Sequence, residues 1–152
     1  MIRGLTLLLC LGAGQALACA DNLVTVSGDW GRANFAVTVA DSGPERSLGL
    51  MNVPQMPLMT GMLFIYDSPH AASFWMRNTL IPLDMLFAGP DGRILSIHEN
   101  AVPLDETSIP GGDNVQFVLE INGGLAARLG ISTGDTLQHP GIGPAAAMPC
   151  GQ

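Results

Sequence analysis

The sequence of 152 residues has about the length of one domain, with 47% hydrophobic and only 12% charged residues. This shortage of charge excludes most disordered proteins and the charge-rich coiled coils. The formal net charge is −7, and all six basic residues are arginines. The chain therefore lacks the basic patch with which proteins bind nucleic acid or an anionic membrane surface.

The N-terminus has the pattern of a secretory signal peptide. Arg3 precedes an apolar run over residues 5–11, and an A-x-A site ends at Ala18. The run is too short to span a bilayer of about 30 Å, and no later segment reaches the ~18 apolar residues of a transmembrane helix. We therefore predict a signal peptide over 1–18 and an exported mature chain, periplasmic or secreted, without a transmembrane segment. Cleavage after Ala20, or an uncleaved interfacial anchor, remains an alternative.

Two cysteines remain in the mature chain, one near each end. Cys10 leaves with the signal peptide, while Cys19 and Cys150 are exported. Disulfides persist in oxidising compartments, and the ends of compact domains often lie close together. We therefore predict a Cys19–Cys150 disulfide. A lipid anchor on Cys19 is the alternative, although Ala16 stands where lipoprotein sites have a large aliphatic residue.

Residues 19–152 are predicted to form a single mainly-β domain, with its core over about 35–139 and an extended tail over 140–152. Short apolar segments, most of them separated by turns rich in Gly and Pro, predict about eight strands. These segments cover residues 23–26, 35–39, 62–66, 72–76, 83–87, 93–97, 115–119 and 136–138. Many short strands with frequent turns are typical of a β-sandwich or barrel.

Two short helices are predicted between the strands. Ser42 and Glu45 have the spacing of a capping box for the first helix. The second helix covers residues 124–129, with Asn122 as its N-cap and Gly130 at its end.

The segment over 74–85 carries the densest group of aromatic and polar residues. Trp75 and Arg77 point to the same side of a strand, and a short connection can bring Arg77 next to Asp84. One interpretation is a structural ion pair between Arg77 and Asp84, braced by a turn at Asn78. The other is a small polar pocket walled by Trp75, in which Arg77 and Asn78 donate and Asp84 accepts hydrogen bonds.

Glu120 interrupts an otherwise apolar run. A buried glutamate needs a partner, which Arg77 or Arg93 can supply, so structural bracing is the alternative to a functional role. The candidates for ligand binding are Trp75, Arg77, Asn78, Thr79, Asp84 and Glu120.

Five motifs, in this order and spacing, resemble the domain of unknown function 192 family, also named uncharacterised protein family 0127. They are Gly49-Leu50-Met51, Gly61-Met62-Leu63-Phe64, Phe74-Trp75-Met76-Arg77-Asn78-Thr79, Ile81-Pro82-Leu83-Asp84-Met85 and Leu119-Glu120-Ile121-Asn122-Gly123-Gly124. The resemblance implies a compact β fold similar to a jelly roll or barrel, often exported or linked to the cell envelope. It implies no established activity. Arg77 stands where the family usually has lysine, and a role that needs a titrating amine does not suit arginine.

Metal sites have little support in the sequence. Thioethers select Cu(I), and Met56 and Met59 lie together in a loop bounded by prolines. The other methionines fit core positions better. The three histidines, at positions 70, 98 and 139, lack zinc-site spacing and are interpreted as surface residues. We predict no cofactor.

The sequence leaves several functions open. The first is a small-molecule or envelope-component binding module near Trp75. The second is a hydrolase with Asp84 or Glu120 as its general base. The third is a structural or partner-binding envelope protein, and Cu(I) handling is a remote fourth. Gly-rich nucleotide loops and serine elbows do not occur in the sequence, and it predicts neither the ligand nor the oligomeric state.

Overall fold

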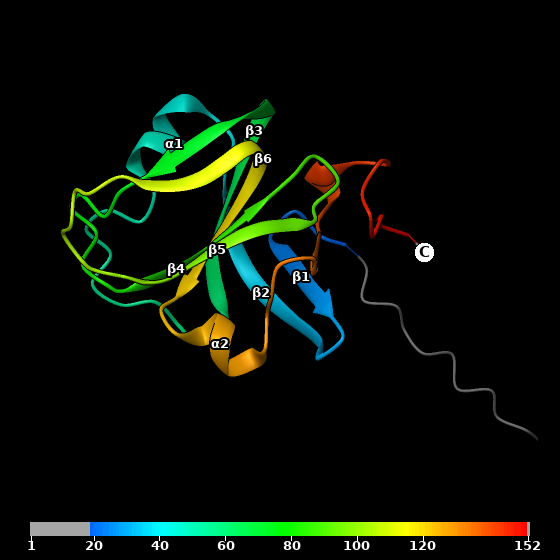
Figure 1. The fold of residues 1–152 in the computed structure, drawn as a ribbon, viewed down its shortest axis with the longest axis horizontal. Coiled ribbons are helices and arrows are strands. Elements are labelled where there is room, and N and C mark those ends of the chain that lie inside the picture. Colours follow the sequence, from blue (N-terminus) through cyan, green and yellow to red (C-terminus); the bar gives the residue numbers. More distant parts are fainter. Residues whose placement is uncertain (1–18, 152) are drawn as a thin grey trace, which may run out of the picture.

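The computed structural model describes residues 19–151, so the predicted signal peptide over 1–18 lies outside the described residues. A β-sheet curls around an apolar interior, with two short helices beside it (Figure 1). The strands are β1 (Leu23–Gly28), β2 (Gly31–Ala40), β3 (Thr60–Phe74), β4 (Leu83–Ala88), β5 (Ile94–Ala101), β6 (Ile109–Asn122) and β7 (Thr136–Gln138). The helices are α1 (Gly43–Leu48), α2 (Leu125–Leu129) and the 3-10 turn η1 (Pro140–Ile142). The predicted mainly-β fold with two short helices is confirmed.

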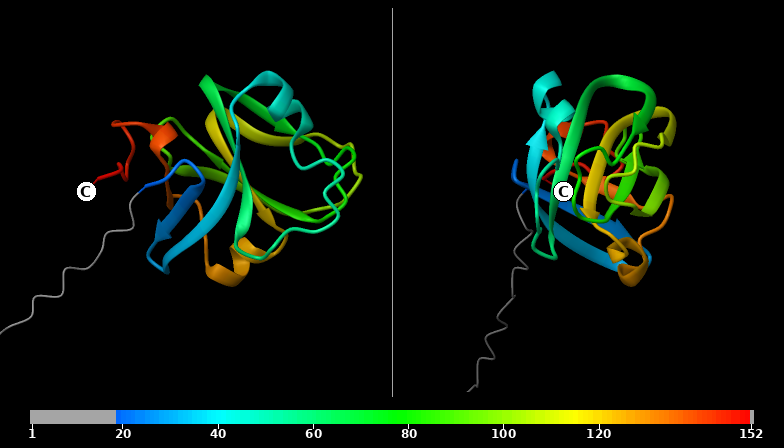
Figure 2. Two further views of the ribbon diagram at one scale, coloured as in Figure 1. Left: turned by 180° about the vertical axis from the view of Figure 1, so that it is seen from behind. Right: turned by 90° about the vertical axis from the view of Figure 1, so that its left-hand side faces the viewer.

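All seven strands belong to one sheet, in the order β5-β4-β6-β3-β2-β1-β7. Neighbouring strands are antiparallel, except that β2 and β3 run parallel and are joined through α1. The two edges of the sheet meet at one end, where Arg93 forms an isolated bridge with Thr136 of β7. The sheet is therefore a partly closed barrel, as the two views of Figure 2 show.

The sheet has one strand fewer than the eight predicted. Residues 62–66 and 72–76 were expected as separate strands, but β3 runs from Thr60 to Phe74 without a break. Its register against β6 shifts three times between Ile65 and Ser73. These irregularities let the strand bend and continue through a segment whose residue types predict a turn.

The first helix forms as predicted, and the second differs at its start. The Ser42 hydroxyl accepts from the Glu45 N–H, while the Glu45 side chain reaches back to the Ser42 N–H, which completes the capping box. Gly130 ends α2 in a left-handed conformation. The predicted N-cap Asn122 is wrong, because its amide donates to the carbonyl of Pro57 instead. Within residues 19–151 no helix is long and apolar enough to cross a membrane.

Alternate residues of the central strand β6 build two separate apolar clusters. Leu119 and Ile121 point into the larger cluster, which packs against β1, β2, β7, α2 and the C-terminal tail. We call this side of the sheet the closed face. Val118 points into the smaller cluster on the opposite side, together with Phe64 of β3 and Met85 of β4. We call that side the cavity face, since the cavity described below opens on it.

The predicted disulfide is present and joins the two ends of the described chain. Cys19 and Cys150 have Cα atoms 5.7 Å apart and a bonded sulfur pair. The sulfur of Cys19 is thus not free to carry the alternative lipid anchor. The tail before Cys150 is packed, because Ile142 is buried on the closed face. The interpretation of His139 as a surface residue is wrong: it is buried, with Nδ1 accepting from the Gly141 N–H and Nε2 bonded to the carbonyl of Asp21.

Candidate functional site

A cavity of about 320 Å³ lies on the cavity face. Residues 46–51, from α1 and the turn after it, form one wall, and residues from the end of β3 and the segment after it, over 73–79, form another. The sheet contributes Phe64, Tyr66 and Glu120. The size and the mixture of apolar walls with a few polar groups are typical of a small-molecule site.

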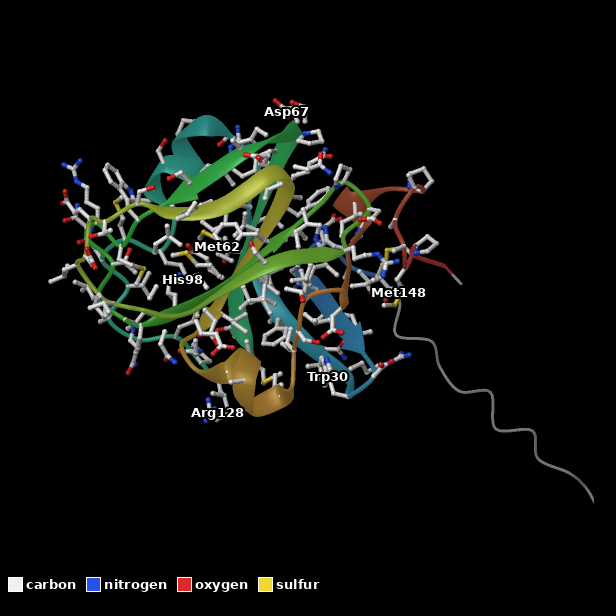
Figure 3. The ribbon with its side chains drawn as sticks, in the orientation of Figure 1. Trp30, Met62, Asp67, His98, Arg128 and Met148 are labelled. Carbon is white, nitrogen blue, oxygen red and sulfur yellow. A yellow bond between two sulfur atoms is a disulfide. The ribbon has the colours of Figure 1, made fainter. Side chains whose placement is uncertain are left out.

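Glu120 lies on β6, an interior strand of the sheet between β4 and β3, and faces this cavity. On β6 it stands opposite Met62 of β3 and Met85 of β4, so its carboxyl has a thioether side chain on either side. Met62 lies within the curl of the sheet in Figure 3. Glu120 is 4% exposed, and this burial raises the pKa of its carboxyl. Among residues 19–151, no side chain or backbone N–H forms a hydrogen bond with this carboxyl.

Burial without a partner keeps the Glu120 carboxyl protonated at neutral pH. Loss of hydration penalises the charged form and raises the pKa of Glu120 from 4.5 to about 8. The neutral carboxyl can both donate and accept a hydrogen bond. It is therefore a polar group whose partner must come from the cavity.

Tyr66 and Arg46 form a second polar group at the cavity. The Arg46 guanidinium lies 4.9 Å from the centre of the Tyr66 ring and donates to the carbonyl of Ile65 at 2.8 Å. Burial raises the pKa of the Tyr66 hydroxyl, nearby Arg46 lowers it, and Glu120 raises it further. Neither residue was predicted from the sequence, because their contact depends on the parallel pairing of β2 with β3 across α1.

Trp75 and Arg77, two of the ligand-binding candidates named from the sequence, lie at the mouth of the cavity. Trp75 is 45% exposed, and the Arg77 guanidinium lies 5.4 Å from its ring. Arg77 pairs with Glu106 at 3.9 Å, and both side chains are more than half exposed. Such a distant, solvated pair contributes little to stability.

Thr79 and Asn78 have different positions relative to the cavity. Thr79 is buried and contributes to the lining, and its carbonyl accepts from the N–H of Leu104 at 3.1 Å. Asn78 adopts φ of 52° and its carbonyl accepts from the N–H of Asn52. Asn78 therefore forms the predicted turn, outside the cavity lining.

Asp84 lies on the closed face, away from Arg77. Its two oxygens accept three backbone N–H groups, from Asn100, Gly124 and Ala126, each at 2.8 Å. Two of these N–H groups belong to the start of α2, so Asp84 takes the capping role predicted for Asn122. The predicted ion pair of Asp84 with Arg77 is wrong, and so are the Arg77 and Arg93 partners expected for Glu120. Arg93 pairs with Asp91 at 3.6 Å.

The methionines proposed for Cu(I) do not converge. Met59 packs against the closed-face cluster, whereas Met56 packs against the cluster of the cavity face. Within residues 19–151 no group of three or more His, Cys, Asp or Glu has the geometry of a metal site.

Comparison with protein families identifies the family of this chain. Residues 24–139 match DUF192, a family described as "Uncharacterized ACR". The chain belongs to the DUF192 family. The resemblance seen in the sequence motifs is thus confirmed, and the family description names no activity. A comparison with curated proteins found no significant match.

Two solved structures share this fold. One is a protein of unknown function from Novosphingobium aromaticivorans DSM 12444, 49% identical over 76% of this chain and 82% of that chain, with a TM-score of 0.74. The other, from Sinorhizobium meliloti 1021, is called a "putative transcription regulator". It is 40% identical over 83% of this chain and 98% of that chain, with a TM-score of 0.77. The descriptions "protein of unknown function" and "putative transcription regulator" belong to these two proteins.

Proposed function

We propose that this DUF192 chain is an exported small-molecule-binding protein and that the cavity beside α1 is its binding site. The supporting observation is Glu120, a carboxyl held on an interior strand of the sheet without a protein partner. Its oxygens are not among the fully enclosed polar atoms without a partner, so in the free protein they are open to solvent in the cavity. A ligand that hydrogen-bonds to Glu120 takes the place of this solvent.

The lining suits a binding role better than hydrolysis. Trp75 and Phe74 provide aromatic surface, and Arg77 provides a charged group at the mouth. Asp84, the other base considered from the sequence, lies outside the lining and is occupied by three N–H groups. A nucleophile with an adjacent base, which hydrolysis of the serine or cysteine type requires, does not occur among the described residues of the lining.

Export is part of the proposal and rests on two features. The N-terminal pattern over 1–18 is that of a signal peptide, and the Cys19–Cys150 disulfide is typical of oxidising compartments. N-terminal sequencing of the protein from the cell envelope or medium should begin at Cys19. Recovery of only the full-length chain with Met1 would contradict this part.

The binding role is tested by a fragment screen on the oxidised mature protein. A compound at 100 times its dissociation constant stabilises the folded state by about 2.7 kcal/mol, which raises the melting temperature measurably. The matched variants are Trp75→Ala, which removes the cavity wall, and Trp30→Phe, which changes the tryptophan on the closed face. We expect hits to shift the emission of Trp75 in the Trp30→Phe protein.

The same hits should lose their stabilising effect in Trp75→Ala and keep it in Trp30→Phe. If they stabilise Trp75→Ala as strongly as the wild type, the site is elsewhere and the assignment of the cavity fails. A screen without any stabilising compound would favour a structural or partner-binding role instead.

A further inference from the structure

We propose that the ligand of this cavity is a small organic acid, an anion with an apolar body, whose charge pairs with Arg77. The inference rests on the binding role proposed above and adds the chemical class of the ligand. It follows from the charges of the lining residues, from the contacts that each arginine already makes, and from the apolar side chains of the lining.

The lining has the opposite charge to the rest of the molecule. Residues 19–151 contain five arginines and thirteen acids, a formal charge of −8. Two of these five arginines, Arg46 and Arg77, line the cavity, and Glu120 is the one acid in the lining. With two arginines and one acid, the lining has a formal charge of at least +1 whatever the state of Glu120, in a strongly negative protein. Such a site attracts anions and repels cations.

The two arginines differ in how freely they can bind. Arg46 donates to the backbone carbonyls of Asp41 and Ile65 and lies over the Tyr66 ring. Its charge still acts on the cavity, but its guanidinium is held in place. Among residues 19–151, the one ionic partner of Arg77 is Glu106, at the long distance of 3.9 Å. Its planar guanidinium is therefore free to form the two parallel hydrogen bonds that carboxylates accept.

The walls require an apolar body for this anion. Leu50, Met51, Phe64, Phe74 and Trp75 contribute to the lining. Anions without an apolar part, such as inorganic phosphate, would leave these side chains without contacts. The volume of about 320 Å³ accommodates a ligand of one or two rings.

Glu120 couples binding of the anion to pH. Tyr66 of β3, Arg46 and Arg77 line the same cavity as Glu120. On the side of β4, Glu120 stands opposite Met85, beyond which the exposed His98 of β5 lies in register. When Glu120 ionises, it places a negative charge in the cavity next to the bound anion. The affinity for an anion therefore decreases as the pH rises above about 8.

The test compares 2-naphthoate with its neutral isostere 2-naphthamide on the oxidised mature protein. Binding is measured by NMR from the indole N–H of Trp75, with the indole of Trp30 as internal reference. We expect millimolar dissociation constants for such small ligands and at least tenfold tighter binding of the carboxylate. Arg77→Gln should remove this preference. The matched control Arg93→Gln, with the same change of net charge on an arginine outside the cavity, should keep it.

The pH series separates the contribution of Glu120. Above pH 8 the wild type should lose affinity for 2-naphthoate by up to tenfold per pH unit, whereas Glu120→Gln should not change. If 2-naphthamide binds as tightly as 2-naphthoate, the anion class is overturned while the binding role stands. Either of two results overturns the organic-acid proposal. One is that Arg77→Gln keeps the preference for the carboxylate, and the other is that 2-naphthoate does not shift the Trp75 signal. The fragment screen tests the binding role independently.

Discussion

Two buried carboxyl groups on neighbouring strands have opposite surroundings. Asp84 of β4 is fully buried on the closed face, and three backbone N–H groups bind its oxygens at 2.8 Å. Glu120 of β6 is nearly as buried on the cavity face, with thioether and aromatic neighbours and an open cavity beside it. Both cost free energy to bury. Backbone N–H groups compensate for this cost at Asp84, whereas the described residues supply no hydrogen bond to the Glu120 carboxyl.

This difference separates a structural carboxylate from a candidate binding group more clearly than burial or sequence position does. Both residues lie in motifs of the DUF192 family, and both interrupt apolar runs. Only the hydrogen-bond partners differ. The protein itself therefore supplies hydrogen bonds to the carboxyl on the closed face, whereas the carboxyl on the cavity face can accept a partner from outside the chain.

The largest expected effect is on the pH dependence of stability at Glu120. The folded-state pKa of about 8 lies above the unfolded value of 4.5. Below pH 4.5 the Glu120 carboxyl is neutral in both the folded and the unfolded state, and it does not lower stability. Between pH 4.5 and 8 it ionises in the unfolded state first, so the folded state becomes less stable relative to the unfolded state until the pH has passed 8. The free energy of unfolding should fall by about 1.4 kcal/mol per pH unit between these values, roughly 5 kcal/mol in all.

Urea unfolding of the wild type and Glu120→Gln at several pH values measures this effect. The Gln variant should gain stability relative to the wild type as the pH rises, since other titrating groups are common to both. Parallel stability curves would show that the Glu120 carboxyl is solvated or paired in solution.

A smaller effect is expected from Asp84→Asn at pH 7. An amide cannot accept all three N–H groups, and the loss of one or more bonds to a buried charged acceptor costs about 2–4 kcal/mol. Urea unfolding measures this loss, and amide exchange at Ala126 should accelerate because α2 loses its cap. An unchanged free energy of unfolding would remove the structural role of Asp84 and return it to the catalytic candidates.

The smallest effect is expected from Arg77→Gln. The ion pair with Glu106 is long and exposed, so the free energy of unfolding should change by less than about 0.5 kcal/mol. A thermal or urea transition measures this directly. A loss above about 1 kcal/mol would instead support the bracing role considered from the sequence, and would weaken the case for Arg77 as a ligand-binding group.

Local signals in the sequence predicted the parts of the fold that depend on neighbouring residues. The capping box at Ser42 is one such signal, and the end of α2 at Gly130 is another. The alternation of strand residues indicated the mainly-β class. The disulfide was predicted from the position of Cys19 and Cys150 near the two ends, together with the predicted signal peptide.

Tertiary contacts decided the features that the sequence did not predict. The N-cap of α2 comes from Asp84, which is 40 residues away from Gly124 in the chain. Trp75 and Arg77 were named as candidates from the sequence, but Arg46 was not, since no local pattern indicates that α1 lies across the cavity from them. Glu120 was recognised as unusual, yet a lack of partners depends on every element around it.

The Cys19–Cys150 disulfide also determines how the molecule bears force. Both ends of the described chain lie on the side of the barrel away from α1 (Figure 1), and α1 contributes to the wall of the cavity. A pull applied between attachments before residue 19 and after residue 150 acts on the sulfur–sulfur bond, and the strands are not peeled apart. The oxidised protein can therefore be tethered by either end, with its cavity facing outward and its sheet shielded from tension.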